Sequence, residues 1–236
     1  MRGRQTVGME IRYLDDEAAA LAVISRAFDA ALAAAVDRGE VADVVLTGGR
    51  SGAAVAAHLA DALLRHPEAQ VRVWIADERW VPTTDTDRND TPIVAALPAS
   101  MRVLVQRHLT PPVDPGIVAA DYAQRLRNAL ADKPFAAVVL SMGEDGHVAS
   151  VFPGHATPSA VAYVEPASPK PPLVRTTIAL PMLARTSTCL VLALGVSKAE
   201  AVHRADRHDA TLPIVQLSNL VHVQLLTDVI PRKSHA

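Results

Sequence analysis

The apolar positions of the chain form two kinds of segment, short continuous runs rich in branched residues and longer alanine-rich stretches with helical spacing. Continuous apolar runs are typical of strands buried on both faces. Such runs, together with a weak one at residues 10–13, predict strands at 10–13, 41–46, 71–76, 135–140, 176–180, 189–194 and 221–226. Helical spacing predicts helices at 15–37, 53–64, 91–97 and 115–130. Strands separated by helices predict an α/β fold with a mainly parallel sheet and helices on both faces.

Composition narrows the class of protein. The chain has 236 residues, of which 50% are apolar and 3% aromatic, so the core is built mainly from Ala, Val, Leu and Ile. This length is typical of one large α/β domain, and we expect a single domain over residues 1–236. With 23 Lys and Arg against 25 Asp and Glu, the net charge of -2 argues against nucleic acid and anionic membranes as partners.

Nothing in the sequence indicates export or membrane insertion. Residues 1–10 contain Arg2 and Arg4 but not the apolar core of a signal peptide. No uninterrupted apolar stretch reaches the roughly 18 residues that a membrane span needs. The single cysteine, Cys189, lies in a predicted buried strand and has no partner for an internal disulfide. We therefore expect a soluble protein of the reducing cytoplasm.

The first candidate site is the glycine-rich run 48–52, Gly-Gly-Arg-Ser-Gly, between the strand at 41–46 and the next predicted helix. Its backbone N–H groups, the Ser51 hydroxyl and the positive end of the helix are suited to a phosphate. The spacing fits neither a Walker loop nor the G-x-G-x-x-G fingerprint. A tight turn without a ligand is the alternative interpretation.

The second candidate site is the run 77–79, Asp-Glu-Arg, which directly follows the strand at 71–76. It places carboxylates and a guanidinium at the rim of the sheet, where a predicted polar loop begins and reaches Asp90. A set of solvated ion pairs is the alternative. A calcium loop starting at Asp85 is excluded, because its sixth position is Asp90 instead of Gly and its twelfth is Ala96 instead of Glu.

The third candidate site is the run 143–147, Gly-Glu-Asp-Gly-His, which follows the strand at 135–140. His147 lies at the exit of a buried strand and is suited to act as a general base near neutral pH. Asp145 would orient the ring or contact the substrate, and a merely structural histidine is the alternative. A metal site is not predicted, because His147 and His155 lack a third ligand at suitable spacing.

Two further cations lie at the ends of predicted elements. Arg175 begins the run that contains the strand at 176–180, and Lys198 lies between the strand at 189–194 and a helix. Each could be an ordinary solvated charge, but a phosphate needs such partners, with Arg supplying two hydrogen bonds and Lys a point charge. The proline-rich run 166–172 is predicted to be a stiff loop beside the site. Ligands of open α/β sheets lie beyond the carboxyl ends of the strands, where these clusters fall.

Four segments, taken in order, resemble one known family. They are Leu-Thr-Gly-Gly at 46–49, Ala-Asp-Glu-Arg-Trp-Val-Pro at 76–82, Met-Gly-Glu-Asp-Gly-His-Val-Ala-Ser-Val-Phe-Pro-Gly-His at 142–155 and Gly-Val-Ser-Lys-Ala at 195–199. In these segments the chain resembles the 6-phosphogluconolactonases. The resemblance implies a modified Rossmann sheet of the ribose-5-phosphate isomerase and CoA-transferase type. It also implies hydrolysis of 6-phospho-D-glucono-1,5-lactone to 6-phosphogluconate in the oxidative pentose phosphate pathway, with no metal or organic cofactor.

The same resemblance implies roles for individual residues. His147 would be the catalytic base, and Arg79 would contact the substrate or its developing negative charge. Asp77 and Asp145 would complete the catalytic group. The phosphate and the sugar would be held by Gly48, Gly49, Arg50, Ser51, Asn89, Arg175 and Lys198. The family commonly has Gly-Gly-Ser-Thr-Pro at the turn, so Arg50 is an added cation, and it often has Ser-Asn where this chain has Arg88 and Asn89.

Two alternatives come from related folds. The glucosamine-6-phosphate deaminases place a Glu five residues after the equivalent His, and this chain has Phe152 there. A sugar-phosphate-binding regulator would normally carry a DNA-binding helix pair before the sugar domain, and we expect none before the strand at 10–13. A catalytically inactive binding protein is a third possibility. The expected partner is a small sugar-phosphate lactone, and the expected state is a monomer or a small homo-oligomer.

Overall fold

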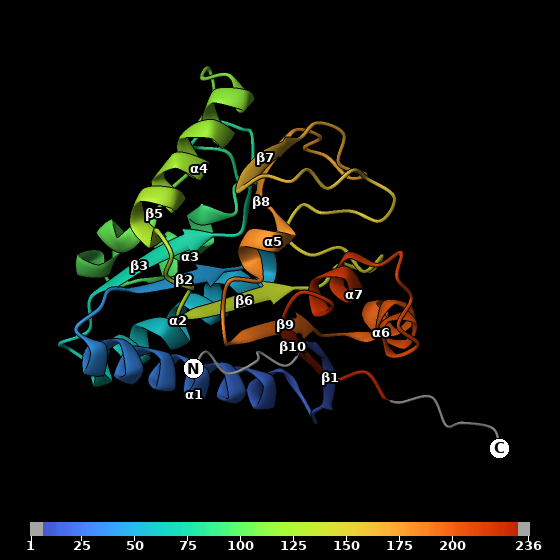
Figure 1. Cartoon of the computed structure of the whole chain (residues 1–236), viewed down its shortest axis with the longest axis horizontal. Coiled ribbons are helices and arrows are strands. Elements are labelled where there is room, and N and C mark those ends of the chain that lie inside the picture. Colours follow the sequence, from blue (N-terminus) through green and yellow to red (C-terminus); the bar gives the residue numbers. More distant parts are fainter. Residues whose placement is uncertain (1–6, 231–236) are drawn as a thin grey trace.

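A seven-stranded parallel sheet runs through the molecule, and the computed structural model describes residues 7–230 without the side chains of Arg50 and Val103 (Figure 1). The strand order is β1-β10-β9-β6-β2-β3-β5, and every neighbouring pair is parallel. The strands are β1 (Gly8–Tyr13), β2 (Ala42–Leu46), β3 (Val71–Ile75), β5 (Val105–Gln106), β6 (Ala137–Ser141), β9 (Cys189–Ala193) and β10 (His222–Thr227). The predicted parallel sheet is confirmed, and β5 is an edge strand that the sequence did not reveal.

Helices cover both faces of this sheet. One face carries α1 (Glu17–Arg38), α2 (Gly49–Arg65) and α3 (Asp90–Ala96), and the other carries α4 (Pro115–Leu130), α5 (Leu180–Leu183), α6 (Ala199–Asp206) and α7 (Pro213–Ser218). Two 3-10 turns, η1 (Ala99–Leu104) and η2 (Val196–Lys198), complete the set. Along β2, Val44 and Leu46 belong to one apolar cluster and Val45 to the other. Both faces are therefore buried, which is why the strands are continuously apolar.

The helix α1 is the most apolar long helix of the fold. Its first turn is capped by Asp16, whose carboxylate accepts the Ala19 N–H at 2.8 Å, and it ends at Gly39 in a left-handed conformation with φ of 63°. By length and composition alone, α1 could cross a membrane. Val23, Ile24, Phe28 and four further residues are buried, however, and they pack in the cluster that α1 forms with α2 and the sheet. This packing is that of a core helix.

A second, smaller sheet corrects two expectations from the sequence. The strands β4 (Asp77–Arg79), β8 (Arg175–Ile178) and β7 (Ala162–Glu165) form an antiparallel sheet in the order β4-β8-β7. The run 77–79 is therefore not the start of a loop, and the run 176–180 does not join the parallel sheet. An antiparallel strand accepts polar side chains well, so the polarity of 77–79 does not exclude a strand. Its partner at 175–177 is too distant along the chain for the local pattern to reveal the pairing.

One helix begins earlier than its pattern predicts. Gly48 is the N-cap of α2, so residues 49–52 form the first turn of the helix instead of a loop that precedes it. Glycine lowers intrinsic helix propensity, and this moved the predicted start to residue 53. The helix α4, by contrast, begins at Pro115 and ends at Leu130 as predicted, because Asp114 and Pro115 form a strong start signal.

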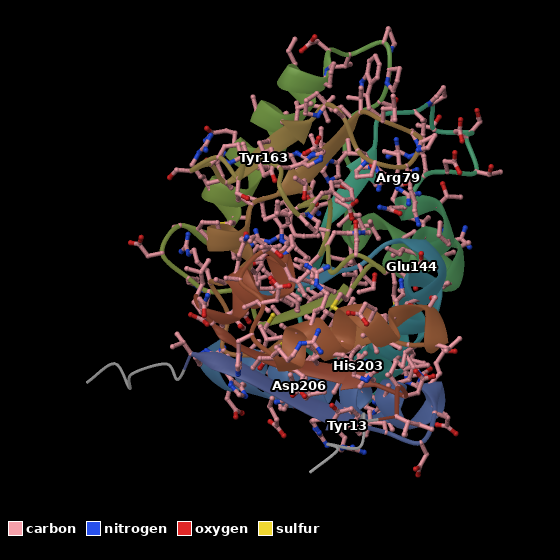
Figure 2. The ribbon with its side chains drawn as sticks, turned by 90° about the vertical axis from the view of Figure 1, so that its right-hand side faces the viewer. Tyr13, Arg79, Glu144, Tyr163, His203 and Asp206 are labelled. Atoms are coloured by element: carbon pink, nitrogen blue, oxygen red, sulfur yellow. The ribbon has the colours of Figure 1, made fainter. Side chains whose placement is uncertain are left out.

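The chain changes winding direction at β2. Its neighbours are β3 on one side and β6 on the other, so the carboxyl ends of β2 and β6 flank a switch point of the sheet. In Figure 1 these ends point to the right, and Figure 2 views the same edge from that side. The hydroxyl of Thr47, directly after β2, and that of Ser141, the last residue of β6, are hydrogen-bonded at 2.8 Å. This edge is where open α/β sheets bind ligands.

Candidate active site

The loop after β6 carries a histidine and an aspartate in direct contact. Nδ1 of His147 lies 2.5 Å from Oδ1 of Asp145, and the same oxygen accepts the His147 backbone N–H at 3.1 Å. Burial opposes ionisation of Asp145, but the hydrogen bond and charge of His147 outweigh it and lower the pKa of Asp145 to about 2. The carboxylate therefore stays ionised at neutral pH and fixes the orientation of the imidazole.

Gly143 allows this pair to form. A Cβ at Gly143 would overlap the His147 ring and would lie 2.8 Å from Oδ1 of Asp145. The turn continues through Gly146, whose φ of 86° is a conformation that glycine adopts without cost. The glycines of the run 143–147 are thus explained by the space that the His147 ring occupies and by the turn that brings it there.

Replacing Gly143 with Ala is expected to lower the turnover of the protein. The new methyl group displaces the His147 ring, and a misplacement of about 1 Å at a reacting group costs about 10²-fold. The measurement is kcat for the substrate proposed below, together with the melting temperature. Gly116→Ala in the first turn of α4 is the control, because there the added Cβ meets only the flexible side chain of Asp114. Wild-type kcat in Gly143→Ala would show that this ring position is not the reactive one.

Two arginines lie side by side on the small sheet. Arg79 of β4 and Arg175 of β8 are directly paired across the strands. Arg175 is 5% exposed and donates to the carbonyls of Lys170 and Pro172, at 2.9 and 3.2 Å. Burial lowers the pKa of Arg175, Asp77 opposes this and the charge of Arg79 adds to it. Two guanidiniums held together in this way favour an anion between or beside them.

Arg79 has an unused donor. Its Nη1 donates to the carbonyl of Asp87, whereas its Nε is buried and has no hydrogen-bond partner within residues 7–230. A buried donor without a partner costs free energy, about 1–3 kcal/mol in typical proteins. An oxygen atom of a bound ligand would satisfy this N–H.

The cations and the histidine line two connected cavities. A central cavity of about 70 Å³ is lined by Gly48, Gly49, Asp77, Arg79, Asn89, Ser141, His147 and Arg175, among others. An arginine cavity of about 400 Å³ shares Arg79, His147 and Arg175 with it, and adds Asp145, Phe152 and the proline-rich loop. Figure 2 shows Arg79 on the same edge of the molecule as Glu144, which lines the arginine cavity as well. The predicted position of the loop at 166–172 beside this region is therefore confirmed.

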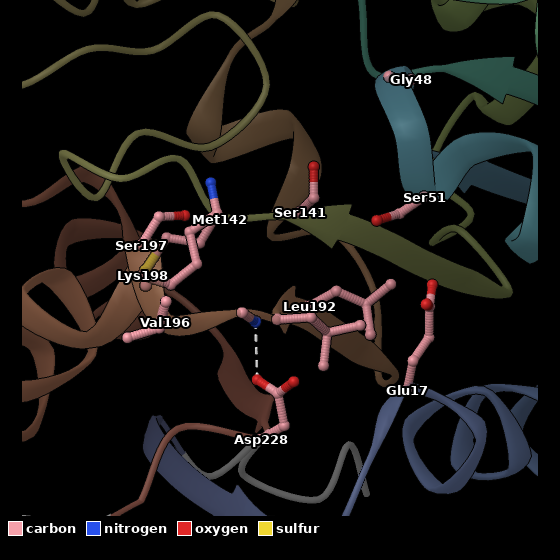
Figure 3. A pocket seen from close by; sticks show the side chains of 13 residues that line it. Glu17, Gly48, Ser51, Ser141, Met142, Leu192, Val196, Ser197, Lys198 and Asp228 are labelled. Atoms are coloured by element: carbon pink, nitrogen blue, oxygen red, sulfur yellow. Dashed lines mark hydrogen bonds between the residues drawn. The ribbon is translucent and has the colours of Figure 1, made fainter.

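A larger cavity adjoins the central one at the start of α2. This glycine cavity, of about 650 Å³, is lined by Gly48, Gly49, Ser51, Ser141, Ser197 and Lys198, among others. In Figure 3 Ser51 and Gly48 lie on one side of it and Ser197 and Lys198 on the other. Lys198 and Arg175 do not line a cavity in common, but each lines one that includes Gly48 and Gly49. The side chain of Arg50 lies outside the described residues.

One backbone N–H of the glycine turn, which was expected to face a ligand, is bonded within the protein instead. The N–H of Gly49 donates to Oδ1 of Asn89 at 3.1 Å, and Nδ2 of Asn89 donates to the carbonyl of Asp77 at 2.8 Å. Gly48 has no space for a Cβ, because the Asn89 side chain lies against it. The amide of Gly49 is therefore engaged within the protein, and Asn89 tethers the turn to β4 while it lines the central cavity.

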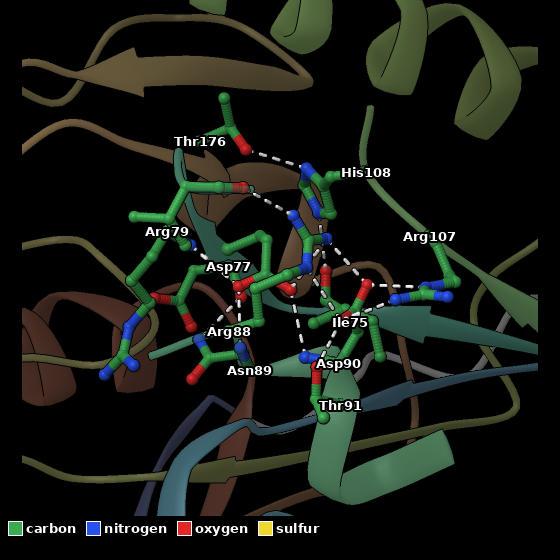
Figure 4. Close-up of polar contacts among 12 residues, drawn as sticks. Ile75, Asp77, Arg79, Arg88, Asn89, Asp90, Thr91, Arg107, His108 and Thr176 are labelled. Atoms are coloured by element: carbon green, nitrogen blue, oxygen red, sulfur yellow. Dashed lines mark hydrogen bonds and ion pairs between the residues drawn. The ribbon is translucent and has the colours of Figure 1, made fainter. Parts of the chain in front are cut away.

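A buried acidic residue, Glu78, holds Asn89 in place, and Figure 4 shows Asn89 beside Arg88 and Asp90. The Glu78 carboxylate accepts the N–H of Asn89 at 2.7 Å and that of Asp90 at 2.9 Å, and it lies 3.2 Å from Arg88. Burial raises the pKa of Glu78 to about 7, against the opposing charge of Arg88. Arg88 also binds Asp90, which Arg107 binds in turn. Arg88 is therefore part of the buried support of the site and does not line its cavities.

Asp77 is hydrogen-bonded to the segment that follows His147. Its Oδ2 accepts from the Ser150 hydroxyl at 2.5 Å, and the Ser150 N–H donates to Oγ1 of Thr177 at 3.2 Å. The neighbouring Ala149 has a φ of 50°, which a residue other than glycine rarely adopts, and it lines the central cavity. Asp77 thus anchors the segment that follows His147, a role that sequence spacing did not reveal.

The predicted set of site residues omits several residues of this edge. Ser141 lies at the end of β6, and the position alone could have drawn attention to it. Ser150 and Phe152 lie close behind His147, but their partners on β4 and β8 come from distant parts of the chain. Across residues 7–230 no group of three or more His, Cys, Asp and Glu has a geometry suited to a metal ion.

The chain matches one family along most of its length. A family model described as glucosamine-6-phosphate isomerases/6-phosphogluconolactonase matches residues 15–225. The 6-phosphogluconolactonase of Streptomyces coelicolor is 36% identical over 208 residues, which cover 80% of this chain and 77% of that protein. The 6-phosphogluconolactonase of Caulobacter vibrioides is 32% identical over 188 residues, which cover 71% and 75%.

Solved structures share the fold. The 6-phosphogluconolactonase of Trypanosoma brucei is 25% identical and superposes with a TM-score of 0.73, over 94% of this chain and 97% of that one. The corresponding protein of Shewanella baltica is 22% identical, with a TM-score of 0.77 over 94% and 97%. The predicted α/β fold with a Rossmann-like parallel sheet is confirmed by both likenesses.

Proposed function

Since the chain belongs to the glucosamine-6-phosphate isomerase/6-phosphogluconolactonase family, we propose that it hydrolyses 6-phospho-D-glucono-1,5-lactone to 6-phospho-D-gluconate. The observation that carries the proposal is the His147–Asp145 pair in cavities that Arg79 and Arg175 also line. A base for water and cations for a charged ester are the two things that this reaction needs. The chain would act as a single-domain enzyme of the cytoplasm in the oxidative pentose phosphate pathway.

The chemical step uses His147 as the base. Nδ1 is engaged by Asp145, so Nε2 takes a proton from water while the water oxygen attacks the lactone carbonyl carbon. The tetrahedral intermediate then expels the ring oxygen, which receives the proton from the imidazolium. The products are the free hydroxyl and a carboxylic acid that loses its proton to solvent. Asp145 stabilises the imidazolium during the step and needs no change of protonation state.

The negative charge of the intermediate falls on the former carbonyl oxygen. Arg79 is the group proposed to receive it, because its buried Nε–H has no partner among residues 7–230 and Arg79 lines the cavity that His147 lines. A donor that is already oriented and desolvated before the reaction stabilises an oxyanion far more than water does.

The phosphate is proposed to bind where α2 begins. Gly48 and Gly49 line both the central cavity, which Arg175 also lines, and the glycine cavity, which Lys198 also lines. The Gly49 amide is engaged by Asn89, and the donors are therefore the next N–H groups of the first turn, at residues 50 and 51, and the Ser51 hydroxyl. Asn89 fixes this turn, and its side chain lines the central cavity, where it is proposed to contact the sugar as well.

Replacing Arg175 or Lys198 with Ala is expected to raise KM more than it lowers kcat. A phosphate anchor binds the substrate and the transition state alike, and a charged hydrogen bond is worth about 1.5–3 kcal/mol, so KM should rise about 10- to 100-fold. Lys133→Ala is the control, since Lys133 pairs with Glu40 on the surface outside the three cavities. A fall in kcat with unchanged KM would contradict the phosphate assignment.

The direct test is hydrolysis of freshly prepared lactone, measured in parallel with turnover of glucosamine 6-phosphate. The lactone also hydrolyses spontaneously, so the rate without protein is subtracted. We expect a rate well above background for the lactone and none for the amino sugar, because Phe152 supplies no acid or base and Asp77 is bonded to Ser150. Turnover of the amino sugar would favour an isomerase, and binding without turnover would favour an inactive binding protein.

A further inference from the structure

Phe152 packs directly against the base. It follows His147 by five residues, is 4% exposed and lines the arginine cavity. The ring centroids of Phe152 and His147 are 4.7 Å apart, with 49° between the planes. A tilted contact at this distance is a favourable aromatic geometry. The ring therefore limits how the imidazole can swing about the Nδ1–Asp145 hydrogen bond.

The same ring contacts the guanidinium of Arg175. The Cζ atom of Arg175 lies 5.6 Å from the centroid of Phe152, within the range of a cation–π contact. Such a contact partly replaces the water that Arg175 loses on burial, and it matters more here because Arg79 brings a second positive charge alongside.

Phe152 is itself held from a third side. Its centroid lies 5.6 Å from that of His155, whose Nδ1 is 3.1 Å from the carboxylate of Glu165. Glu165 lies on β7 directly opposite Arg175 of β8. Phe152 thus contacts Arg175 of β8 directly and is linked to Glu165 of β7 through His155. The pairing of β7 with β8 sets the positions of these two partners relative to each other.

We propose that Phe152 is a positioning residue that fixes the His147 imidazole and the Arg175 guanidinium relative to each other, so that the base and the phosphate anchor act on one substrate as a unit. The inference rests on the proposed function. It explains why a large apolar ring lies among the charged side chains of the arginine cavity. A substrate whose phosphate is held by Arg175 then has its ester carbon at the reach of His147.

The test compares two lactones on two variants. Phe152→Leu keeps an apolar side chain but removes the aromatic face, and Phe152→Tyr restores that face. With the phosphorylated lactone, Phe152→Leu is expected to raise KM about 2- to 30-fold, the value of a cation–π contact, and also to lower kcat. With D-glucono-1,5-lactone, which has no phosphate, kcat should still fall and KM should stay unchanged. Phe152→Tyr should return both constants toward the wild type.

Two controls separate positioning from general damage. Phe135→Leu removes another buried ring, at the amino end of β6 and outside the three cavities, and it should lower the melting temperature without the substrate-dependent split. In the Arg175→Ala background, Phe152→Leu should no longer change KM, because the contact through which it acts is gone. If Phe152→Leu raises KM by the same factor with and without Arg175, the proposal is wrong.

Other outcomes are equally decisive. Unchanged constants in Phe152→Leu, or the same KM change with both lactones, would overturn the proposal while lactone hydrolysis by the wild type stood. If the wild type leaves the lactone at the background rate, the proposed function fails instead. Calorimetric binding of 6-phosphogluconate then decides the role of Phe152. Weaker binding in Phe152→Leu supports the contact with Arg175, and equal binding overturns it.

Discussion

Replacing His147 with Ala is expected to lower kcat for the phosphorylated lactone by about 10²–10⁴-fold, the usual loss when a general base is removed. The substitution takes away the only group that the proposed step uses to deprotonate water. KM should change little, because the phosphate is held by other groups. The measurement is a steady-state assay with the spontaneous rate subtracted, and a kcat close to the wild type would remove His147 from the mechanism.

A second variant and the pH profile sharpen this experiment. His147→Asn keeps a side chain that can bond to Asp145 but cannot accept a proton from water, so it should be as slow as His147→Ala. The pKa of Asp145 is about 2, so its carboxylate stays ionised between about pH 5 and 8 and contributes no change of rate there. A general base must be unprotonated to act, so we expect the wild-type kcat/KM to fall toward acid pH and both variants to lack this fall. His58→Ala, on α2 outside the three cavities, is the control histidine.

Arg79→Ala is expected to have the second-largest effect, a fall in kcat of about 10²–10³-fold. This is the typical cost of removing one oxyanion donor, about 2.7–4 kcal/mol. The reason is the buried Nε–H, which has no protein partner among the described residues and lies beside the cavity of His147. Since the interaction forms mainly in the transition state, kcat and kcat/KM should fall together.

Arg79→Lys distinguishes a directed donor from a simple charge. Lysine keeps the positive charge but has no Nε–H at the same position, so it should recover only a small part of the lost rate. Arg65→Ala, on α2 and in an exposed ion pair with Asp29 of α1, is the control arginine. If Arg79→Ala mainly raises KM, then Arg79 is a phosphate ligand and the oxyanion must be held by another group.

The parallel sheet could be predicted because its strands carry their own signal. Residues such as Val44, Val45 and Leu46 are apolar at successive positions, which only a strand covered on both faces explains. The loops after these strands then had to meet at one edge, which is why His147, Gly48 and Lys198 were predicted to lie there; Gly48 lines one cavity with His147 and another with Lys198. Their exact roles stay predictions that the variants above will decide.

The support of the site could not be predicted in the same way. The run 77–79 is polar, and only its partner strand β8 makes it part of a sheet. The engagement of the Gly49 amide by Asn89 depends on a buried carboxylate, Glu78, which binds the segment 88–90 from a distant part of the chain. Such contacts arise from tertiary packing, which leaves no periodic trace in the chain.

The direct pairing of Arg79 with Arg175 has a consequence for redesign. Opposed residues of an antiparallel pair keep their Cα atoms about 4.5–5.5 Å apart, whatever the surrounding loops do. Strand pairing therefore fixes the spacing of the backbone positions that carry the two guanidiniums. Other sugar phosphates should be accommodated by substitutions at the exposed residues Glu144 and Lys170, while β4 and β8 are left unchanged. Nζ of Lys170 lies 3.4 Å from Oε2 of Glu144.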